Sequence, residues 1–182
     1  MKADATVELS ELIGLFYPNP DLLGEFTVCS AQECPQPYRE LLHHNAHMTV
    51  TVERHHGGPV DVQVLEAKQV DNRYARRIVL RRQSDHHIVQ FGIVRMRLDA
   101  VKDKVQEEIL SQKIPLGRVL IQNNVLREVK LANLWKVGCG ADLAHVFSVA
   151  PGDITYGRTA MIYCDGEPTV ELLEIVAPET TF

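Results

Sequence analysis

The sequence predicts an α+β fold in which an antiparallel β-sheet packs against helices. Several segments alternate between apolar and polar side chains and occur in pairs joined by short turns, a pattern typical of β-hairpins. Other segments between these pairs carry apolar residues at helical spacing. The chain has 182 residues, of which 45% are hydrophobic, so one domain over residues 1–182 can bury a core and enclose a cavity.

The first half of the chain contains two predicted helices and one predicted hairpin. Apolar spacing indicates a helix over 7–16 and a shorter one over 37–44. From residue 48 to 53 the side chains alternate in polarity, which predicts a half-buried strand. The histidine- and glycine-rich turn at 55–59 then leads into a second alternating segment at 60–64, so we expect these two strands to pair.

The rest of the chain contains two further predicted strand pairs. Residues 73–82 and 86–97 form the first pair, and residues 156–164 and 169–177 form the second. Between the pairs, residues 101–112 have the apolar stripe of an amphipathic helix. No clear pattern is present in 118–129 and 143–149.

Composition and charge disfavour several classes of protein. The net charge is −5, so we expect no nucleic-acid partner, because nucleic-acid binding depends on neutralising phosphates. No run approaches the roughly 18 apolar residues of a membrane span, and the first residues lack the pattern of a secretory signal. The four cysteines include no Cys-x-x-Cys pair. A reduced, cytoplasmic protein with a small-molecule partner is therefore the prediction; the oligomeric state stays open.

Two charged side chains fall on apolar faces of predicted strands. Arg76 shares a face with Ile78 and Leu80, and Glu174 shares one with Leu172 and Val176. A buried charge without a partner costs several kcal/mol, so a chain keeps one when it is paired or when it serves a ligand. Arg76 and Glu174 are therefore candidates for a dry polar site. The alternatives are that they pair with each other or reach solvent at the strand ends.

A set of short motifs in a fixed order resembles the chorismate pyruvate-lyases and the wider bacterial family that shares their fold. The resemblance covers residues 45–178. Its motifs are His47-Met48-Thr49, Tyr74-Ala75-Arg76-Arg77-Ile78-Val79-Leu80, the turn Pro115-Leu116-Gly117-Arg118-Val119-Leu120, Leu126-Arg127, Tyr156-Gly157-Arg158, and the closing Gly166-Glu167-Pro168 with Glu174 and Pro178.

The resemblance implies a fold with helical or loop flaps over an internal site. It also implies the conversion of chorismate to a hydroxybenzoate, 4-hydroxybenzoate in the family's members, and pyruvate, with no cofactor and no metal. A hydroxybenzoate made in this way would serve ubiquinone-type quinone synthesis or aromatic natural products. The resemblance further implies that Arg76 grips the ring carboxylate and that Glu174 acts near the ether and hydroxyl end of the substrate.

Met48, Leu116 and Gly117 follow as site residues from the same resemblance, and Arg118 and His47 are candidates from their positions in the sequence. Met48 and Leu116 would line the pocket, and backbone N–H groups near Leu116 or Gly117 would meet the carboxylate. Arg118 either binds an anionic substrate, supports the site, or pairs with Glu128 at the surface. His47 would touch the pocket through its position beside Met48.

Three features depart from the family pattern. Glu171 remains a lesser candidate for the acidic residue, because the spacing from Pro168 to Glu174 is one residue longer than in some members. The segment 131–155 is longer than in compact members and is expected to reshape the mouth of the pocket. The histidines His43, His44 and His47 are also unusual in number.

We predict no metal site from the histidines. His43 and His47 have the four-residue spacing that suits a metal on a helix. A continuous helix between them is not expected, because the predicted strand begins at Met48. Surface histidines in turns are the preferred interpretation. Gly138-Cys139-Gly140 is no phosphate loop, since it lacks the lysine and the strand-to-helix context.

Three functions are consistent with these residues. The first is a lyase acting on chorismate. The second is a non-catalytic module of the same fold that binds an aromatic carboxylate, as in the effector domains of some transcription regulators. The third is a lyase acting on a different small acid. No helix-turn-helix precedes the domain in this sequence, which favours the enzyme over the regulator. A binder needs Arg76 but has no need of an acid at Glu174.

Overall fold

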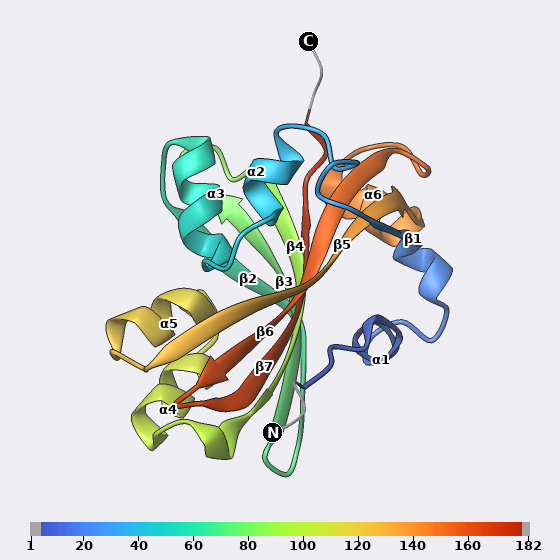
Figure 1. Cartoon of the computed structure of the whole chain (residues 1–182). Coiled ribbons are helices and arrows are strands. Elements are labelled where there is room, and N and C mark those ends of the chain that lie inside the picture. Colours follow the sequence, from blue (N-terminus) through green and yellow to red (C-terminus); the bar gives the residue numbers. More distant parts are fainter. Residues whose placement is uncertain (1–4, 180–182) are drawn as a thin grey trace.

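The computed structural model describes residues 5–179, and residues 1–4 and 180–182 of the predicted domain lie outside that part. It has an α+β architecture (Figure 1). The strands are β1 (Gly24–Cys29), β2 (Val60–Val70), β3 (Arg73–Arg82), β4 (Ile88–Arg97), β5 (Arg127–Cys139), β6 (Ile154–Cys164) and β7 (Glu167–Val176). The helices are α1 (Leu9–Gly14), α2 (Tyr38–Leu42), α3 (Met48–His56), α4 (Asp103–Leu110), α5 (Leu116–Gln122) and α6 (Ala141–Phe147), with 3₁₀ turns η1 (Pro20–Leu22) and η2 (Leu98–Ala100).

The seven described strands form one antiparallel sheet in the order β1-β5-β6-β7-β4-β3-β2. The predicted hairpins β3–β4 and β6–β7 are both present, and β4 pairs with β7 to join them. This junction places Glu174 of β7 between Gly92 of β4 and Arg158 of β6. The α+β prediction with an antiparallel sheet is confirmed.

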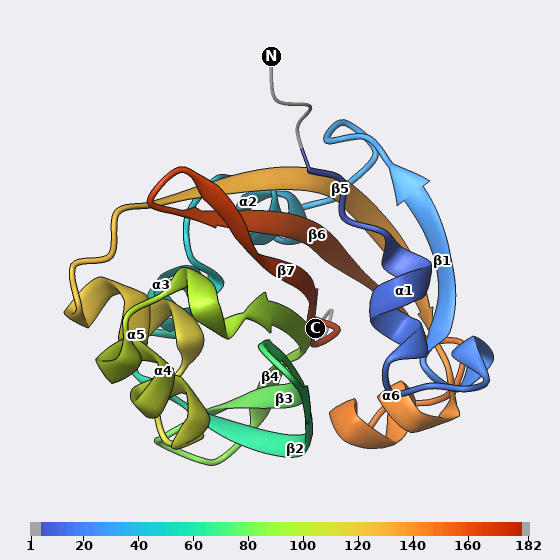
Figure 2. The same cartoon turned by 90° about the horizontal axis from the view of Figure 1, so that it is seen from below.

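The strongly curved sheet separates two groups of helices (Figure 2). On one face, α1 and α6 pack over Val79, Phe91 and Leu173. The opposite face is covered by α2, α3, α4 and α5, which bury apolar residues such as Leu80 and Leu172. Alternation along each strand therefore sends successive side chains into two separate cores.

The prediction of a strand at 48–53 is wrong, because this segment begins α3. In an alternating segment, residues four apart are both apolar, and residues four apart also share one face of a helix. Met48 and Val52 are such a pair, and both are buried. Gly57 ends the helix with a left-handed backbone, φ 71°, which glycine adopts without steric cost. The expected hairpin with 60–64 is therefore absent, and β2 pairs with β3 instead.

Two further segments differ from their predictions. The segment Pro-Leu-Gly-Arg, expected as a turn, opens α5, with Pro115 preceding its first residue. The unassigned 118–129 contains the rest of α5 and the start of β5. Within residues 5–179, no helix combines the length and the apolar character needed to cross a bilayer.

Candidate functional site

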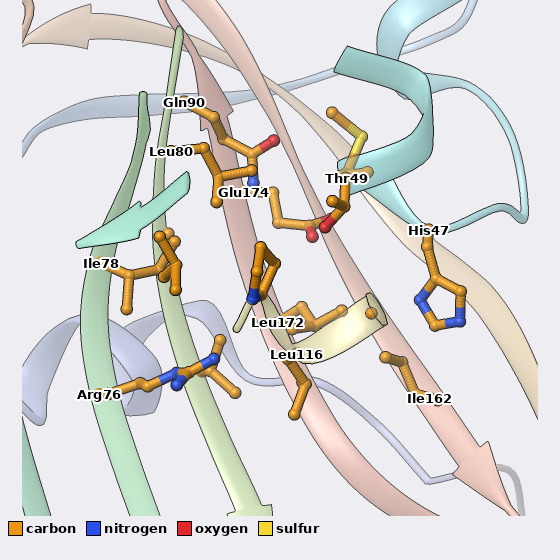
Figure 3. A pocket seen from close by; sticks show the side chains of 16 residues that line it. His47, Thr49, Arg76, Ile78, Leu80, Gln90, Leu116, Ile162, Leu172 and Glu174 are labelled. Atoms are coloured by element: carbon orange, nitrogen blue, oxygen red, sulfur yellow. The ribbon is translucent and has the colours of Figure 1, made fainter. Parts of the chain in front are cut away.

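A small cavity lies between the sheet and the helices α3 and α5 (Figure 3). Its volume of about 40 Å³ is room for roughly three water molecules. The sheet contributes one wall and the first turns of the two helices contribute the other. The lining residues are His47, Met48, Thr49, Val62, Arg76, Ile78, Leu80, Gln90, Gly92, Val94, Pro115, Leu116, Gly117, Ile162, Leu172 and Glu174.

Arg76 brings a buried cation to this cavity. Its side chain is 1% exposed, and its neighbours across β2 and β4 are Ala67 and Val94, which offer no counter-charge. The guanidinium makes a long contact of 3.5 Å to the carbonyl of Ile109 and interacts with the hydroxyl of Tyr74. Within residues 5–179 its Nε has no partner and no acidic group forms an ion pair with it. Burial lowers the pKa of this guanidinium, although an arginine keeps its charge.

Glu174 is paired, and its partner is Arg158. Arg158 Nε donates to Glu174 Oε2 over 2.8 Å, and the Arg158 side chain is fully buried. The other Arg158 nitrogens donate to the carbonyls of His44 and Ala46, at 2.8 and 2.9 Å. Arg158 therefore holds both Glu174 and the loop that leads into α3. The alternative in which Arg76 and Glu174 pair with each other is wrong.

Arg158 was missed as a site residue, although it stands in one of the motifs that carry the family resemblance. Strand alternation could have found it, because it shares a face of β6 with the buried Ala160 and Ile162. Gln90 was missed as well. It is 3% exposed, lines the cavity from β4, and its Oε1 has no partner among the described residues. Strand alternation could have found Gln90 too, because it shares a face of β4 with Ile88 and Val94.

Met48, Leu116 and Gly117, which the family resemblance implied, lie around the cavity. His47, expected there from its position beside Met48, lines it as well. Arg127 Nε donates to His47 Nε2 over 2.8 Å. Burial, followed by the charges of Arg127 and Arg158, lowers the pKa of His47 to about 4, so its imidazole is neutral at pH 7. Gly117 lies close beneath this ring, since an added Cβ would come 3.1 Å from His47 Nδ1.

Three predictions about the site need correction. Arg118 does not line the cavity and does not pair with Glu128; it forms an ion pair with Glu53 that joins α5 to α3. Glu171 lies on the opposite face of β7 from Glu174 and pairs with Arg95, because residues three apart in a strand point to opposite sides.

The third correction concerns 131–155. This segment contributes no lining residue to the cavity. Helix α6 and part of β5 pack in the core on the other side of the sheet, through Val137, Leu143 and Phe147. Leu134 of β5 packs with Met48 on the cavity side, and the Leu131 N–H donates to Asn45 Oδ1 over 3.1 Å. The segment therefore supports the loop before α3 but does not line the cavity itself.

Comparisons with known proteins show the fold and nothing finer. No family model and no curated protein matches the sequence. PhnF from Mycobacterium smegmatis matches with a TM-score of 0.51 and 8% identity, over 72% of this chain and 64% of that one. The ligand-binding domain of a putative GntR-family transcriptional regulator from Bordetella bronchiseptica matches with a TM-score of 0.49 and 13% identity, over 68% and 92%.

Proposed function

We propose that this chain binds a small organic acid in the cavity and that Arg76 holds the acid's carboxylate. The supporting observation is the buried guanidinium of Arg76, which has no acidic partner among the described residues. A lone buried charge is unfavourable by several kcal/mol, and breaking a buried pair has a similar cost. A carboxylate matches the two-pronged donor edge of a guanidinium and would restore the missing partner.

The residues at the other end of the cavity indicate what the rest of the ligand is like. Figure 3 shows Glu174, Gln90 and Thr49 grouped away from Arg76, with Ile78 and Leu172 between the two ends. The Gln90 Oε1 is an unused acceptor and the Glu174 carboxylate has further acceptor capacity. We infer a ligand with an apolar body and a hydroxyl or amine donor opposite its carboxylate, as in a hydroxybenzoate.

Such a ligand needs more room than the cavity now offers. About 40 Å³ suits a few waters, so a six-membered ring enters only when the helical wall moves outward. The ion pair between Arg118 and Glu53 joins α5 and α3, which form that wall. These two helices would therefore move together as the flap over the site.

A lyase acting on chorismate is the second candidate, and the shared cavity of Arg76 and Glu174 favours it. Arg76 would hold the ring carboxylate while the bond between the ring carbon and the ether oxygen breaks and enolpyruvate leaves. The ring carbon that bears the hydroxyl loses its proton, which makes the ring aromatic, and a proton on the methylene carbon of enolpyruvate gives pyruvate. Glu174 is bound to Arg158, so we assign it the role of hydrogen-bond acceptor for the ring oxygen. Because it is held by Arg158, Glu174 is better suited to accept a hydrogen bond from a bound ligand than to donate a proton to it.

The test is a calorimetric titration with benzoate, 4-hydroxybenzoate and chorismate, followed by an assay for pyruvate. We expect 4-hydroxybenzoate to bind more tightly than benzoate, and Arg76→Met to weaken both by tenfold or more, about 1.4 kcal/mol. Arg81→Met is the matched control, because Arg81 stands on the same strand and bonds to Gln63 away from the cavity.

The outcomes separate the candidates. Binding without pyruvate release supports the binding module. Release of pyruvate with 4-hydroxybenzoate, above the spontaneous rate and lost in Arg76→Met, supports the lyase. Unchanged acid binding in Arg76→Met would contradict the proposal in both forms.

A further inference from the structure

Two histidines and a glutamate meet far from the cavity, where the last turn of α3 reaches the chain that follows β7. His55 Nε2 lies 2.9 Å from Glu179 Oε1. The rings of His55 and His56 stand edge to face, with centroids 4.8 Å apart. One ligand atom from each of His55, His56 and Glu179 lies within 4.8 Å of the others.

The backbone holds both parts of this cluster in place. Gly57, in the left-handed region, ends α3 directly after His56, and the Gly58 N–H donates to the Glu53 carbonyl over 3.1 Å. The Glu179 N–H donates to the hydroxyl of Tyr38, in α2, over 2.8 Å. The three side chains therefore converge from two anchored segments, and little backbone order must be gained to use them together.

We propose that His55, His56 and Glu179 bind one divalent transition-metal ion of the Zn²⁺ type. Zn²⁺ takes imidazole nitrogen and carboxylate oxygen at about 2.0–2.2 Å, so ligand atoms around one ion lie roughly 3–4 Å apart. The His55–Glu179 distance already falls near that range, and separations of up to 4.8 Å within the cluster have to shorten by about 1–2 Å at most. Water completes the tetrahedron.

The ligand set selects among cations. Imidazole nitrogen suits Zn²⁺, Cu²⁺ and Ni²⁺, whereas Mg²⁺ and Ca²⁺ prefer shells made only of oxygen. The site departs from the expectation that these histidines are surface residues in turns. It was not visible in the sequence because Glu179 lies 123 residues beyond His56 and is brought there by β7.

Metal binding here would fasten α3 to the end of the sheet. The first turn of α3 walls the cavity and its last turn carries the two histidines. An ion that binds the folded chain and not the unfolded one raises the free energy of unfolding in proportion to RT ln(1 + [metal]/Kd). This stabilisation does not depend on any ligand in the cavity.

The experiment uses the full chain without a histidine tag, stripped of metal by a chelator. Calorimetric titration with Zn²⁺ should show one equivalent bound and a higher unfolding temperature. His55→Gln and Glu179→Gln should each weaken binding by about tenfold or more, because the loss of a ligand costs at least as much as the loss of an outer hydrogen bond. Glu179 comes after the last strand, so its replacement by glutamine should leave the core intact.

Two controls make the result decisive. His145→Gln, on the exposed side of α6, should leave Zn²⁺ affinity unchanged. The absorption spectrum with Co²⁺ should lack a thiolate band, since the four cysteines are not part of the site. The proposal is overturned by no saturable Zn²⁺ uptake, by unchanged affinity in both His55→Gln and Glu179→Gln, or by a cobalt–thiolate band.

Discussion

Arg158 and Glu174 form a buried ion pair between neighbouring strands, with 2.8 Å between Arg158 Nε and Glu174 Oε2. They are directly opposite each other in the β6–β7 register, so the sheet itself sets their distance. The same guanidinium bonds two carbonyls of the loop before α3. The pair therefore connects the acidic end of the cavity to the flap that covers it.

Arg158→Met should destabilise the protein by about 3–5 kcal/mol, because it leaves the Glu174 carboxylate buried without its partner. The double variant Arg158→Met, Glu174→Leu should recover much of this loss, since neither charge is then buried. Urea unfolding measures both. A double variant as unstable as the single one would show that the loop contacts, and not the ion pair, carry the effect.

Arg76→Met should change the free energy of unfolding in the opposite direction to Arg158→Met. Removing a buried charge that lacks a protein partner should raise the free energy of unfolding of the ligand-free protein by about 1–3 kcal/mol. The unfolding free energy of Arg81→Met should change by about 0.5 kcal/mol or less, as expected for a surface site. A clear loss of stability in Arg76→Met would mean that its guanidinium is satisfied in the folded chain.

His47 should make stability depend on pH below about 6.5, the ordinary pKa of histidine. Its pKa in the folded chain is lowered to about 4, so between these values the unfolded chain binds the extra proton. Stability is therefore fully present above about pH 6.5 and is lost toward pH 4, by at most about 1 kcal/mol per pH unit after allowing for partial solvent access.

The pKa values of His44 and His56 are lowered as well, so the wild-type slope has several sources. The informative measurement is the difference in unfolding free energy between wild type and His47→Gln. Urea unfolding at a series of pH values from 8 to 4 gives this difference. Wild type should lose stability relative to the variant as the pH falls. A difference that stays constant over this range would rule out the lowered pKa.

Gly140→Ala should destabilise the protein by about 2 kcal/mol or more, in the range of strained core substitutions. A Cβ at this position would overlap the carbonyl oxygens of Asp21 and Leu22, which are backbone atoms and cannot rotate away. Gly138→Ala is the matched control, because its Cβ would meet its nearest neighbour at 3.8 Å. Thermal unfolding compares the two, and equal effects would contradict the close approach.

The corrected site residues show where sequence patterns stop being informative. Glu171 and Glu174 were both candidates, and residues three apart in a strand lie on opposite faces. In the structure Glu171 pairs with Arg95, whereas Glu174 lines the cavity. Arg118 stands in the family-like motif, yet its partner is Glu53 of α3. Since α3 was predicted as a strand, no local pattern could have indicated that pair.

The hairpins β3–β4 and β6–β7, and the faces on which Arg76 and Glu174 lie, could be predicted from the order of residues along the chain. Alternation with a period of two is a local property, so it can be read without knowing the fold. Which charges meet depends instead on how distant strands assemble. The neighbours of β7 are β4 and β6, which gives Glu174 its partner Arg158 and leaves Arg76 opposite Ala67 and Val94. Strand order is set by packing between distant segments. Packing also made 48–56 a helix, since Met48 and Val52 share one face under either period.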